Sequence, residues 1–485
     1  MHIYVSGIGG TAMASLALIA HEAGFEVSGS DARPSGYLEY LRDHGVTETH
    51  IGVDDEFIEQ IHAKNPIDWF IYGSAQPIDF PDHPEFKFCK THRIKQSKRD
   101  EFLSHLIKEK GLKLISIAGT HGKTTTTAMA TWVFKQMNMP VSYSGGAKLS
   151  FGDVAEFDAK SEYFVYETDE YDRNFLSFYP EVAMISGIDW DHPDIYPTRE
   201  SYYQAFSEFL DQSSRAMVWS DDAEKLGIKA AEKFVILDKD DPEINQVKLA
   251  GLVNRQNAWL VASGLAELLD KPRQEIVKVL NQFPGVSRRF EQIAANIYSD
   301  SAHTPGKIRG ALQLAFEVIN QRSRVSGLDA VQGSSEERAS RTTGTVSERK
   351  SVTDKALRQE HQRVIGSADK QSDAAGGPGV VVVYEGLHNL RQHFIKDDLA
   401  NLFDDVKKLY VVPSYLARED PNLPTLSPAD LVNLLSKSSK EHAEASQINE
   451  KLAAKIKDHA TDDDLVLCLS AGGAGSLDEW LRQNF

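Results

Sequence analysis

Residues 112–127 read Leu-Lys-Leu-Ile-Ser-Ile-Ala-Gly-Thr-His-Gly-Lys-Thr-Thr-Thr-Thr. The first half is a short apolar run, which predicts a buried strand of a parallel sheet. Gly119 and Gly122 then permit a tight turn, and the threonine-rich segment after Lys123 predicts a helix. A strand, a glycine turn and a helix N-terminus together form an anion site, because free backbone N–H groups point toward the ligand. The stretch therefore predicts a site for the phosphates of a nucleotide.

This phosphate turn, defined as residues 119–125, differs from the usual P-loop spelling. Ile117 stands where the first glycine of G-x-x-x-x-G-K-[ST] is expected. We expect Lys123 to reach the terminal phosphates and the Thr124 hydroxyl to face a magnesium ion. A simpler alternative is a glycine-rich strand-to-helix turn that carries a surface lysine. The expected phosphate contacts are Gly119, Thr120, His121, Gly122, Lys123, Thr124 and Thr125.

The composition is typical of a soluble multidomain protein. A chain of 485 residues is too long for one ordinary core, and we expect two to three domains. The formal charge of −18 argues against general binding to nucleic acids and to anionic membrane surfaces. Cys89 and Cys468 are far apart and lack His or Cys neighbours at ligand spacing, which excludes a disulfide framework or zinc site and fits a reducing compartment. The apolar stretch 13–20 is too short to span a bilayer, so we expect a cytoplasmic protein.

A second glycine pattern lies at the amino terminus. Residues 2–6 predict a strand, after which Gly7, Gly9 and Ala12 fit the pattern G-x-G-x-x-[GA]. Asp31 follows at about the spacing of a ribose-binding carboxylate. A dinucleotide cofactor is one interpretation, but the same geometry holds the diphosphate of any nucleotide. The glycines can also serve only the close packing of a helix on a strand.

Acidic side chains follow two further predicted strands. Residues 163–166 form an apolar run that ends at Glu167, and residues 182–185 lead to Asp191 and His192. Ligands of open α/β sheets bind beyond the carboxyl ends of parallel strands, where these side chains are expected. Carboxylate and imidazole groups there would complete a magnesium site at the phosphate turn. The alternatives are a solvated acidic loop and an Asp-His pair that caps a turn.

Strands alternate with helices along most of the chain, which predicts an α/β fold. A helix is expected from about residue 307 to 319. Between 321 and 379 the chain is dominated by Ser, Arg, Glu, Gly, Thr, Ala and Asp, and we predict a disordered insert. The expected domains are a Rossmann-like domain at 1–111, a central P-loop ATPase-like domain with a parallel-rich sheet at 112–290, and a Rossmann-like carboxyl-terminal domain at 291–485.

Taken together, these motifs resemble the Mur ligase family, the ATP-dependent amide-forming enzymes of bacterial peptidoglycan assembly. The resemblance covers nearly the whole chain apart from residues 321–379. Gly7-Ile8-Gly9-Gly10 and Ser28-Gly29-Ser30-Asp31 resemble most closely the branch that joins L-alanine to UDP-N-acetylmuramate. The remaining motifs are Gly119-Thr120-His121-Gly122-Lys123-Thr124-Thr125, Glu167-x-Asp169-Glu170-x-Asp172, Asp191-His192, Asn254-x-x-Asn257-Ala258, Arg288-Arg289-Phe290 and Asp300-x-Ala302-His303-x-Pro305.

The resemblance implies a role for each matching position. The first domain would bind the UDP-sugar, and the phosphate turn would bind ATP with Mg²⁺. The implied UDP-sugar contacts are Gly7, Gly9, Gly10, Ser30, Asp31 and Ser74. Beyond the turn, the implied ATP contacts are Asn254 and Asn257 near adenine, Arg289, and Asp300 near the ribose. The implied metal ligands are Thr124, Glu167 and His192, and the implied catalytic residues are Lys123, Glu167, His192 and His303.

The reaction implied by the resemblance converts a carboxylate into an acyl phosphate, which an amine then attacks. Closure of the third domain would exclude water from this intermediate. We expect a monomer or weak homodimer that needs neither nucleic acid nor membrane.

Some positions depart from the alanine-adding pattern and keep alternatives open. Val253 and Thr304 each replace an expected histidine, and Tyr171 resembles the recycling ligase that adds a whole tripeptide to UDP-N-acetylmuramate. That ligase is the main alternative. An NAD-dependent dehydrogenase is a remote alternative, because it would not explain Lys123, Glu167 and His192 together. A non-catalytic nucleotide-binding protein is another remote alternative, because the expected metal and phosphate residues are all present.

Overall fold

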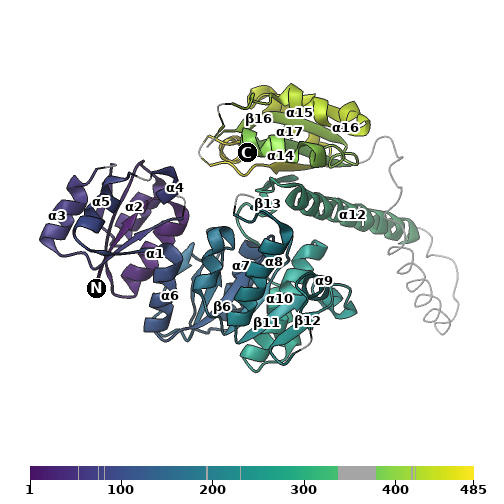
Figure 1. The fold of residues 1–485 in the computed structure, drawn as a ribbon. Coiled ribbons are helices and arrows are strands. Elements are labelled where there is room, and N and C mark those ends of the chain that lie inside the picture. The colour runs from purple at the N-terminus through teal and green to yellow at the C-terminus, as the bar shows by residue number, and fades with distance from the viewer. Residues whose placement is uncertain are drawn as a thin grey trace. The chain divides into compact units, whose positions relative to one another are not determined.

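The computed structural model describes residues 1–485 except 53, 75, 81, 193–194, 230, 337–377, 417–418, 421 and 474, and it describes the backbone alone at 78–79 and 323–336. The chain divides into two compact units, Met1–Arg289 and Phe290–Phe485 (Figure 1). In the described part of the chain the strands form three sheets, two in the first unit and one in the second. The expected α/β fold class is confirmed.

The amino-terminal sheet consists of β1 (His2–Ser6), β2 (Glu26–Asp31), β3 (Glu48–Ile51), β4 (Trp69–Tyr72) and β5 (Lys95–Lys98). The strands are parallel and lie in the order β3-β2-β1-β4-β5, which is the order of a Rossmann-like sheet. The helices of this region are α1 (Thr11–Glu22), α2 (Gly36–Asp43), α3 (Glu56–Lys64), α4 (Gln76–Asp79), α5 (Pro84–Thr91) and α6 (Arg99–Glu109). Ile3 and Val5 pack with α1 and α6, whereas Tyr4 packs with α3 and α5, so both faces of the sheet are covered.

The middle sheet consists of β6 (Lys113–Ala118), β7 (Ser142–Ser144), β8 (Ala155–Glu156), β9 (Tyr163–Glu167), β10 (Val182–Ile185), β11 (Arg215–Trp219) and β12 (Phe234–Leu237). Its order is β12-β11-β10-β6-β9-β7-β8, and β8 is its antiparallel member. The helical elements are α7 (Lys123–Gln136), η1 (Tyr171–Ser177), α8 (Arg199–Gln212), α9 (Ser220–Lys225), η2 (Pro242–Gln246), α10 (Leu252–Leu268) and α11 (Arg273–Leu280). Met184 packs with α7 and α10, whereas Ile185 packs with α8.

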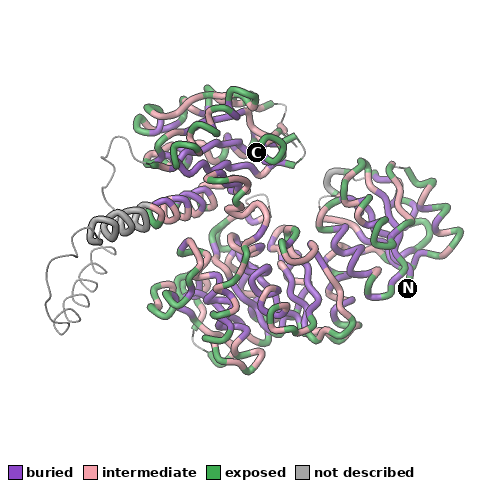
Figure 2. The backbone as a smooth tube through the Cα atoms, turned by 180° about the vertical axis from the view of Figure 1, so that it is seen from behind, coloured by how far each residue is buried: buried purple, intermediate pink, exposed green. Residues whose placement is uncertain are grey.

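The two sheets of the first unit share one hydrophobic cluster. Leu114, Phe164, Tyr166 and Phe178 of the middle region pack in the same cluster as the buried residues of α1 and α6. Figure 2 shows buried residues, coloured purple, gathered in the interior of this unit. The predicted domains 1–111 and 112–290 therefore form one compact body.

The sheet of the second unit consists of β13 (Glu291–Ala294), β14 (Ile297–Asp300), β15 (Val380–Leu387), β16 (Lys408–Tyr415), β17 (Ala443–Ala445) and β18 (Leu465–Leu469). Its order is β13-β14-β18-β15-β16-β17, and only the β13–β14 pair is antiparallel. The helices are α12 (Pro305–Glu336), α14 (Asn389–Leu399), α15 (Pro428–Leu434), α16 (Lys437–His442), α17 (Glu450–Thr461) and α18 (Leu477–Asn484). Val382 packs with α12 and α15, and Val383 packs with α17 and α18, so this sheet is also covered on both faces.

Helix α12 is longer than the sequence predicts. It was expected to end near Ile319, where a disordered insert at 321–379 was to begin, but it continues to Glu336. Buried residues line its first half (Figure 2), and Arg322 then donates a hydrogen bond of 2.8 Å to the hydroxyl of Tyr298. This contact holds the helix against β14 just beyond Ile319, where it was expected to end. Residues 337–377 of the predicted insert lie outside the described residues.

None of the helices in the described part of the chain combines the length and the apolar character needed to cross a bilayer.

Candidate functional site

The phosphate turn joins β6 to α7 through two glycines with positive φ. Gly119 has φ 131° and Gly122 has φ 82°. A Cβ atom on Gly119 would lie 2.6 Å from the hydroxyl of Ser186, and one on Gly122 would lie 3.1 Å from the amide of Asn257. Gly122 is also the N-cap residue of α7 and has no side chain that could accept the N–H groups of the first turn. The turn therefore leaves a helix N-terminus available to an anion.

Thr120 fixes this turn to the loop that follows β10. Its backbone N–H donates to the carbonyl of Gly187 at 2.8 Å, and its hydroxyl donates to the carbonyl of Asp189 at 2.6 Å. The hydroxyl also lies 2.8 Å from that of Tyr202. The Thr120 side chain thus belongs to the support of the turn, whereas a phosphate contact of this residue stays a prediction.

Lys123 is held at the turn by a buried acid. Its Nζ donates to the carbonyl of Gly119 and to Oε2 of Glu170, each at 2.6 Å. The Glu170 side chain is 1% exposed and that of Lys123 is 15% exposed. Burial alone would lower the pKa of Lys123, but the neighbouring carboxylates, Glu170 first among them, raise the pKa above its ordinary value. The ammonium group stays charged and is well placed to compensate phosphate charge.

Beside Lys123, the hydroxyl of Thr124 and the carboxylate of Glu167 place oxygen atoms at the turn. Thr124 donates a hydrogen bond from Oγ1 to Oε1 of Glu167 at 3.0 Å, and the N–H of Gly146 donates to Oε2 of Glu167 at 2.6 Å. Nη2 of Arg289 lies 3.4 Å from the Thr124 hydroxyl. The fold thus brings together three residues that the sequence predicts for one site, Thr124 and Glu167 from segments 43 positions apart and Arg289 from 165 positions beyond Thr124.

Hydroxyl and carboxylate oxygens are the hard donors that Mg²⁺ prefers, and this ion usually completes its shell with water and substrate phosphates. No group of three His, Cys, Asp or Glu side chains is arranged around a metal position in the described ranges. The donor set at Thr124 and Glu167 fits a magnesium ion that is shared with a nucleotide, rather than one enclosed by protein.

His192 faces the acid that holds Lys123. Its Nε2 lies 3.9 Å from Oε1 of Glu170 and 4.0 Å from Oδ2 of Asp191. The ring also packs edge-on against Tyr171, with centroids 5.1 Å apart. His192 therefore lies beside Glu170, and its predicted role as a metal ligand stays a prediction.

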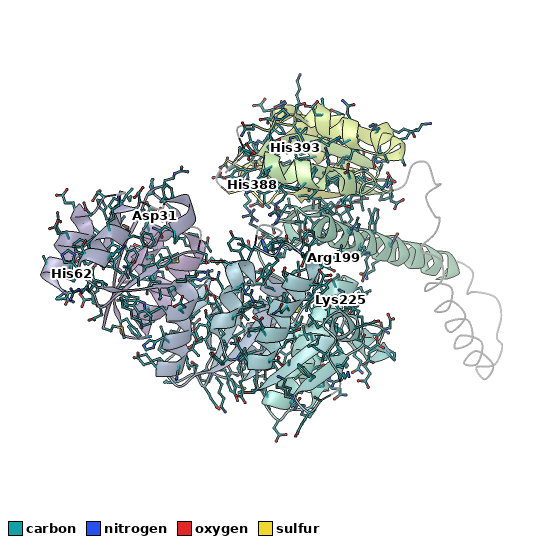
Figure 3. The ribbon with its side chains drawn as sticks, viewed as in Figure 1. Asp31, His62, Arg199, Lys225, His388 and His393 are labelled. Atoms are coloured by element: carbon teal, nitrogen blue, oxygen red, sulfur yellow. The ribbon has the colours of Figure 1, made fainter. Side chains whose placement is uncertain are left out.

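Lys225 supports the loop that carries His192 (Figure 3 labels this lysine). Its Nζ donates to the carbonyl of Ile188 at 2.6 Å and to Oδ1 of Asp222 at 2.9 Å, and it lies 3.6 Å from Asp189. Asp222 is fully buried, and burial raises the pKa of its carboxyl group despite the adjacent ammonium. Lys225 therefore anchors the strand-to-loop transition at β10.

Helix α10 contributes the two predicted adenine-site amides. The side chain of Asn257 is buried and lies against Gly122 of the phosphate turn. The amide of Asn254 donates to the carbonyl of Ala250 at 3.0 Å. The structure thus places Asn257 at the turn, and the adenine contacts of both residues stay predictions.

The amino-terminal glycine turn is closed by Asp31, labelled in Figure 3. Its Oδ2 accepts the N–H of Gly9 at 2.9 Å, and its Oδ1 accepts the N–H of Arg33 at 3.0 Å. Gly7 has φ 74° and donates to the carbonyl of Ser30 at 2.8 Å. The N-terminus of α1 begins after Gly10 without a side-chain cap, which leaves a second anion site.

Two predicted sugar-site hydroxyls take part in contacts within the first unit. Ser30 donates to Glu85, a buried carboxylate that also accepts the hydroxyl of Tyr4 at 2.6 Å. Ser74 donates to Oδ1 of Asn174 at 3.1 Å. Sequence reasoning missed Glu85, because nothing in its helical segment marks it as the acid that gathers hydroxyls from β1 and β2. The same is true of Glu170, which belongs to the acidic motif but had no assigned role.

The predicted residues of the second unit lie at the end of β14. Asp300 accepts the N–H of Phe290 through Oδ2 and that of Ala302 through Oδ1, each at 2.7 Å. Nδ1 of His303 lies 2.8 Å from the carbonyl of Ser301. Asp300 thus fixes the start of this unit by accepting two backbone N–H groups. The nucleotide contact predicted for it stays a prediction.

Another loop of the second unit lies between β15 and α14 and contains His388. His388, labelled in Figure 3, has φ 55° and donates its backbone N–H to the carbonyl of Tyr415 at 2.9 Å. The loop therefore connects the carboxyl ends of β15 and β16, where ligands of open α/β sheets bind.

Comparisons with known proteins identify the family of the chain. A model described as "Mur ligase family, catalytic domain" matches residues 2–110, and one described as "Mur ligase middle domain" matches residues 117–260. A UDP-N-acetylmuramate–L-alanine ligase of Clavibacter sepedonicus is 30% identical over 349 residues, which are 66% of this chain and 71% of that protein.

Two solved structures share the fold. The UDP-N-acetylmuramate–alanine ligase of Thermotoga maritima is 20% identical, with a TM-score of 0.67 over 100% of this chain and 98% of the other. A murein peptide ligase of Psychrobacter arcticus is 19% identical, with a TM-score of 0.56 over 98% of this chain and 96% of the other.

Proposed function

The chain belongs to the Mur ligase family, and on this premise we propose that it joins L-alanine to UDP-N-acetylmuramate at the expense of ATP. The proposal rests above all on one observation. Lys123 and the Thr124–Glu167 pair meet at an uncapped helix N-terminus, as phosphoryl transfer requires.

The proposed reaction has two steps. A carboxylate oxygen of the acid substrate attacks the γ-phosphorus of ATP, the bond from that phosphorus to the bridging oxygen breaks, and ADP leaves. The amine nitrogen of L-alanine then attacks the acyl carbon, inorganic phosphate leaves, and the nitrogen gives up a proton to a base. Lys123 compensates charge on the transferring phosphoryl oxygens throughout.

Magnesium, when bound, would neutralise phosphate charge and orient the γ-phosphoryl group. Thr124 and Glu167 are the proposed ligands from this chain, with His192 as a third. The remaining ATP contacts proposed are the phosphate turn, Asn254, Asn257, Arg289 and Asp300, and His303 is proposed as a catalytic residue.

The UDP-sugar is proposed to bind in domain 1–111, with its diphosphate at Gly7, Gly9 and Gly10 before α1. Domain 112–290 would bind ATP, and domain 291–485 would deliver the amine. The proposed site of action is the cytoplasm, where both nucleotide substrates are available.

One observation favours a second candidate, the tripeptide-adding ligase. Tyr171 resembles that branch in sequence, and its ring packs against His192 beside the phosphate turn.

The experiment that decides between them measures phosphate release with ATP and UDP-N-acetylmuramate while amino acids and the tripeptide L-alanyl-D-glutamyl-diaminopimelate are supplied in turn. We expect the highest kcat/KM for L-alanine. A Lys123→Ala protein provides the background rate. A higher kcat/KM for the tripeptide would replace the proposal with the recycling reaction, and no release with any amine would refute both.

A further inference from the structure

A cavity of about 210 Å³ adjoins the phosphate turn within the first unit. Apolar side chains of α1 and α6, among them Leu16 and Leu103, form an apolar wall of this cavity. The charged residues that also line it are Arg99 at the start of α6, Lys123, Glu167 and Asp169. The cavity therefore connects the proposed phosphoryl-transfer groups with the amino-terminal region of the unit.

Arg99 is held rigidly at this cavity. Its Nε and Nη2 donate to the two carboxylate oxygens of Asp100 at 3.1 and 3.0 Å, and Asp100 also accepts the hydroxyl of Tyr166 at 2.6 Å. Asp100 is 2% exposed, whereas the Arg99 side chain is 17% exposed. The two described hydrogen bonds of Arg99 do not use Nη1, which carries two further N–H donors. The guanidinium is thus oriented before any ligand binds.

The chemistry of the cavity identifies the kind of group that fits it. A planar guanidinium with N–H donors in a fixed fork binds carboxylates with geometric specificity. The cavity is smaller than those that enclose a drug-sized ligand, so it suits a short acyl group and not a whole sugar nucleotide. Both cations of the cavity have an acidic partner, Glu170 for Lys123 and Asp100 for Arg99. The hydrogen bonds of Arg99 to Asp100 use Nε and Nη2, so the donors of Nη1 are available to a substrate carboxylate.

We propose that Arg99 binds the lactyl carboxylate of UDP-N-acetylmuramate and presents it to the γ-phosphate of ATP, with the lactyl methyl group against the apolar wall. This inference rests on the proposed function and adds to it a binding residue for the acid substrate. Arg99 would then determine that a sugar nucleotide carrying a carboxylate is preferred over one that lacks it.

The test compares two ligands that differ by the lactyl group, UDP-N-acetylmuramate and UDP-N-acetylglucosamine. Their affinities are measured by calorimetry for the wild-type protein, Arg99→Met and Lys108→Met. Lys108 lies on the same helix, is exposed, and loses the same charge. We expect Arg99→Met to lower the affinity for UDP-N-acetylmuramate by about tenfold to a hundredfold, because a hydrogen bond to a charged group is lost. The affinity for UDP-N-acetylglucosamine should stay unchanged. Lys108→Met should keep both affinities.

Arg99→Met leaves the buried Asp100 without its cation and can therefore disturb the fold. The double variant Arg99→Met/Asp100→Asn removes both charges and should show the same selective loss. The inference is overturned if these variants lower the affinity for both ligands equally, or if they keep the full preference for UDP-N-acetylmuramate. If the wild-type protein still turns over UDP-N-acetylmuramate, the proposed function stands and only the role of Arg99 is refuted.

Discussion

Lys123 and Glu167 carry the two kinds of charge that phosphoryl transfer needs. We expect Lys123→Ala and Glu167→Ala each to lower kcat by about a hundredfold or more, because each removes a group aimed at developing charge. Steady-state phosphate release at saturating ATP and Mg²⁺ measures the loss. Lys148→Ala is the matched control, since the Lys148 side chain is 71% exposed.

The two variants should differ in stability. Lys123→Ala leaves the buried Glu170 carboxylate without its cation, whereas Glu167→Ala removes only the acceptor of the Thr124 hydroxyl and of the Gly146 N–H. We therefore expect a lower melting temperature for Lys123→Ala than for Glu167→Ala. Near-normal turnover in either purified, folded variant would contradict the site assignment.

The residues that could be predicted from the sequence lie in contiguous motifs. Lys123 and Thr124 follow a glycine turn, and Glu167 directly follows an apolar run, so local patterns alone identify them. The partnership of Lys123 with Glu170, and the position of Arg99 at the same cavity, depend on how separate strands are ordered in the sheets. Spacing along one chain carries no such information.

Helix α7 contains two buried hydroxyls, those of Thr126 and Thr127, that have no hydrogen-bond partner in the part of the chain that the structure describes. A buried unsatisfied hydroxyl costs about 1–3 kcal/mol, and an apolar group of the same shape avoids that cost. We therefore expect Thr126→Val to raise the melting temperature by about 2–4 °C in a thermal scan.

Thr131→Val is the control on the same helix, because the Thr131 hydroxyl donates to the carbonyl of Thr127 at 2.9 Å. Thr131→Val should not raise the melting temperature. A fall in melting temperature for Thr126→Val, with activity lost as well, would mean that this hydroxyl serves a bound ligand.

The helices and strands themselves follow closely from periodicity. The apolar spacing of Ile308, Leu312, Ala315 and Ile319 predicts the first half of α12, and these residues are buried. The contact of Arg322 with Tyr298 of β14 becomes visible only when the helix and the strand are placed beside each other. Apolar spacing along the helix does not predict this contact.

The two compact units have hydrophobic clusters of their own. We expect residues 1–289 expressed alone to unfold in one cooperative transition, within about 5 °C of a transition of the full chain, because their burial does not depend on later residues. This fragment should bind ADP but release no phosphate in the ligase assay, since it lacks Asp300 and His303. Circular dichroism melting checks the cooperative transition, and calorimetry checks the binding of ADP. A fragment that melts without cooperativity would contradict the expectation that residues 1–289 fold alone.

The sequence predicts three α/β domains, and the sheets agree with that fold class, including the Rossmann-like order of the first. It does not predict that Leu114 and Phe164 join the cluster of α1 and α6, because the hydrophobic pattern of a strand gives its buried face but not the identity of the partner.

The hydrophobic cluster shared by α1, α6, Leu114 and Phe164 has a consequence for recombination between the genes of related ligases. Exchange of coding segments between relatives tends to succeed where a crossover separates few contacts. A crossover near codon 111 would pair α1 and α6 from one parent with Leu114 and Phe164 from another, and the chimera would have to repack a buried surface. A crossover at codons 289 and 290 falls at the boundary of the two compact units instead. Exchange of the second compact unit for that of a relative is therefore best attempted there.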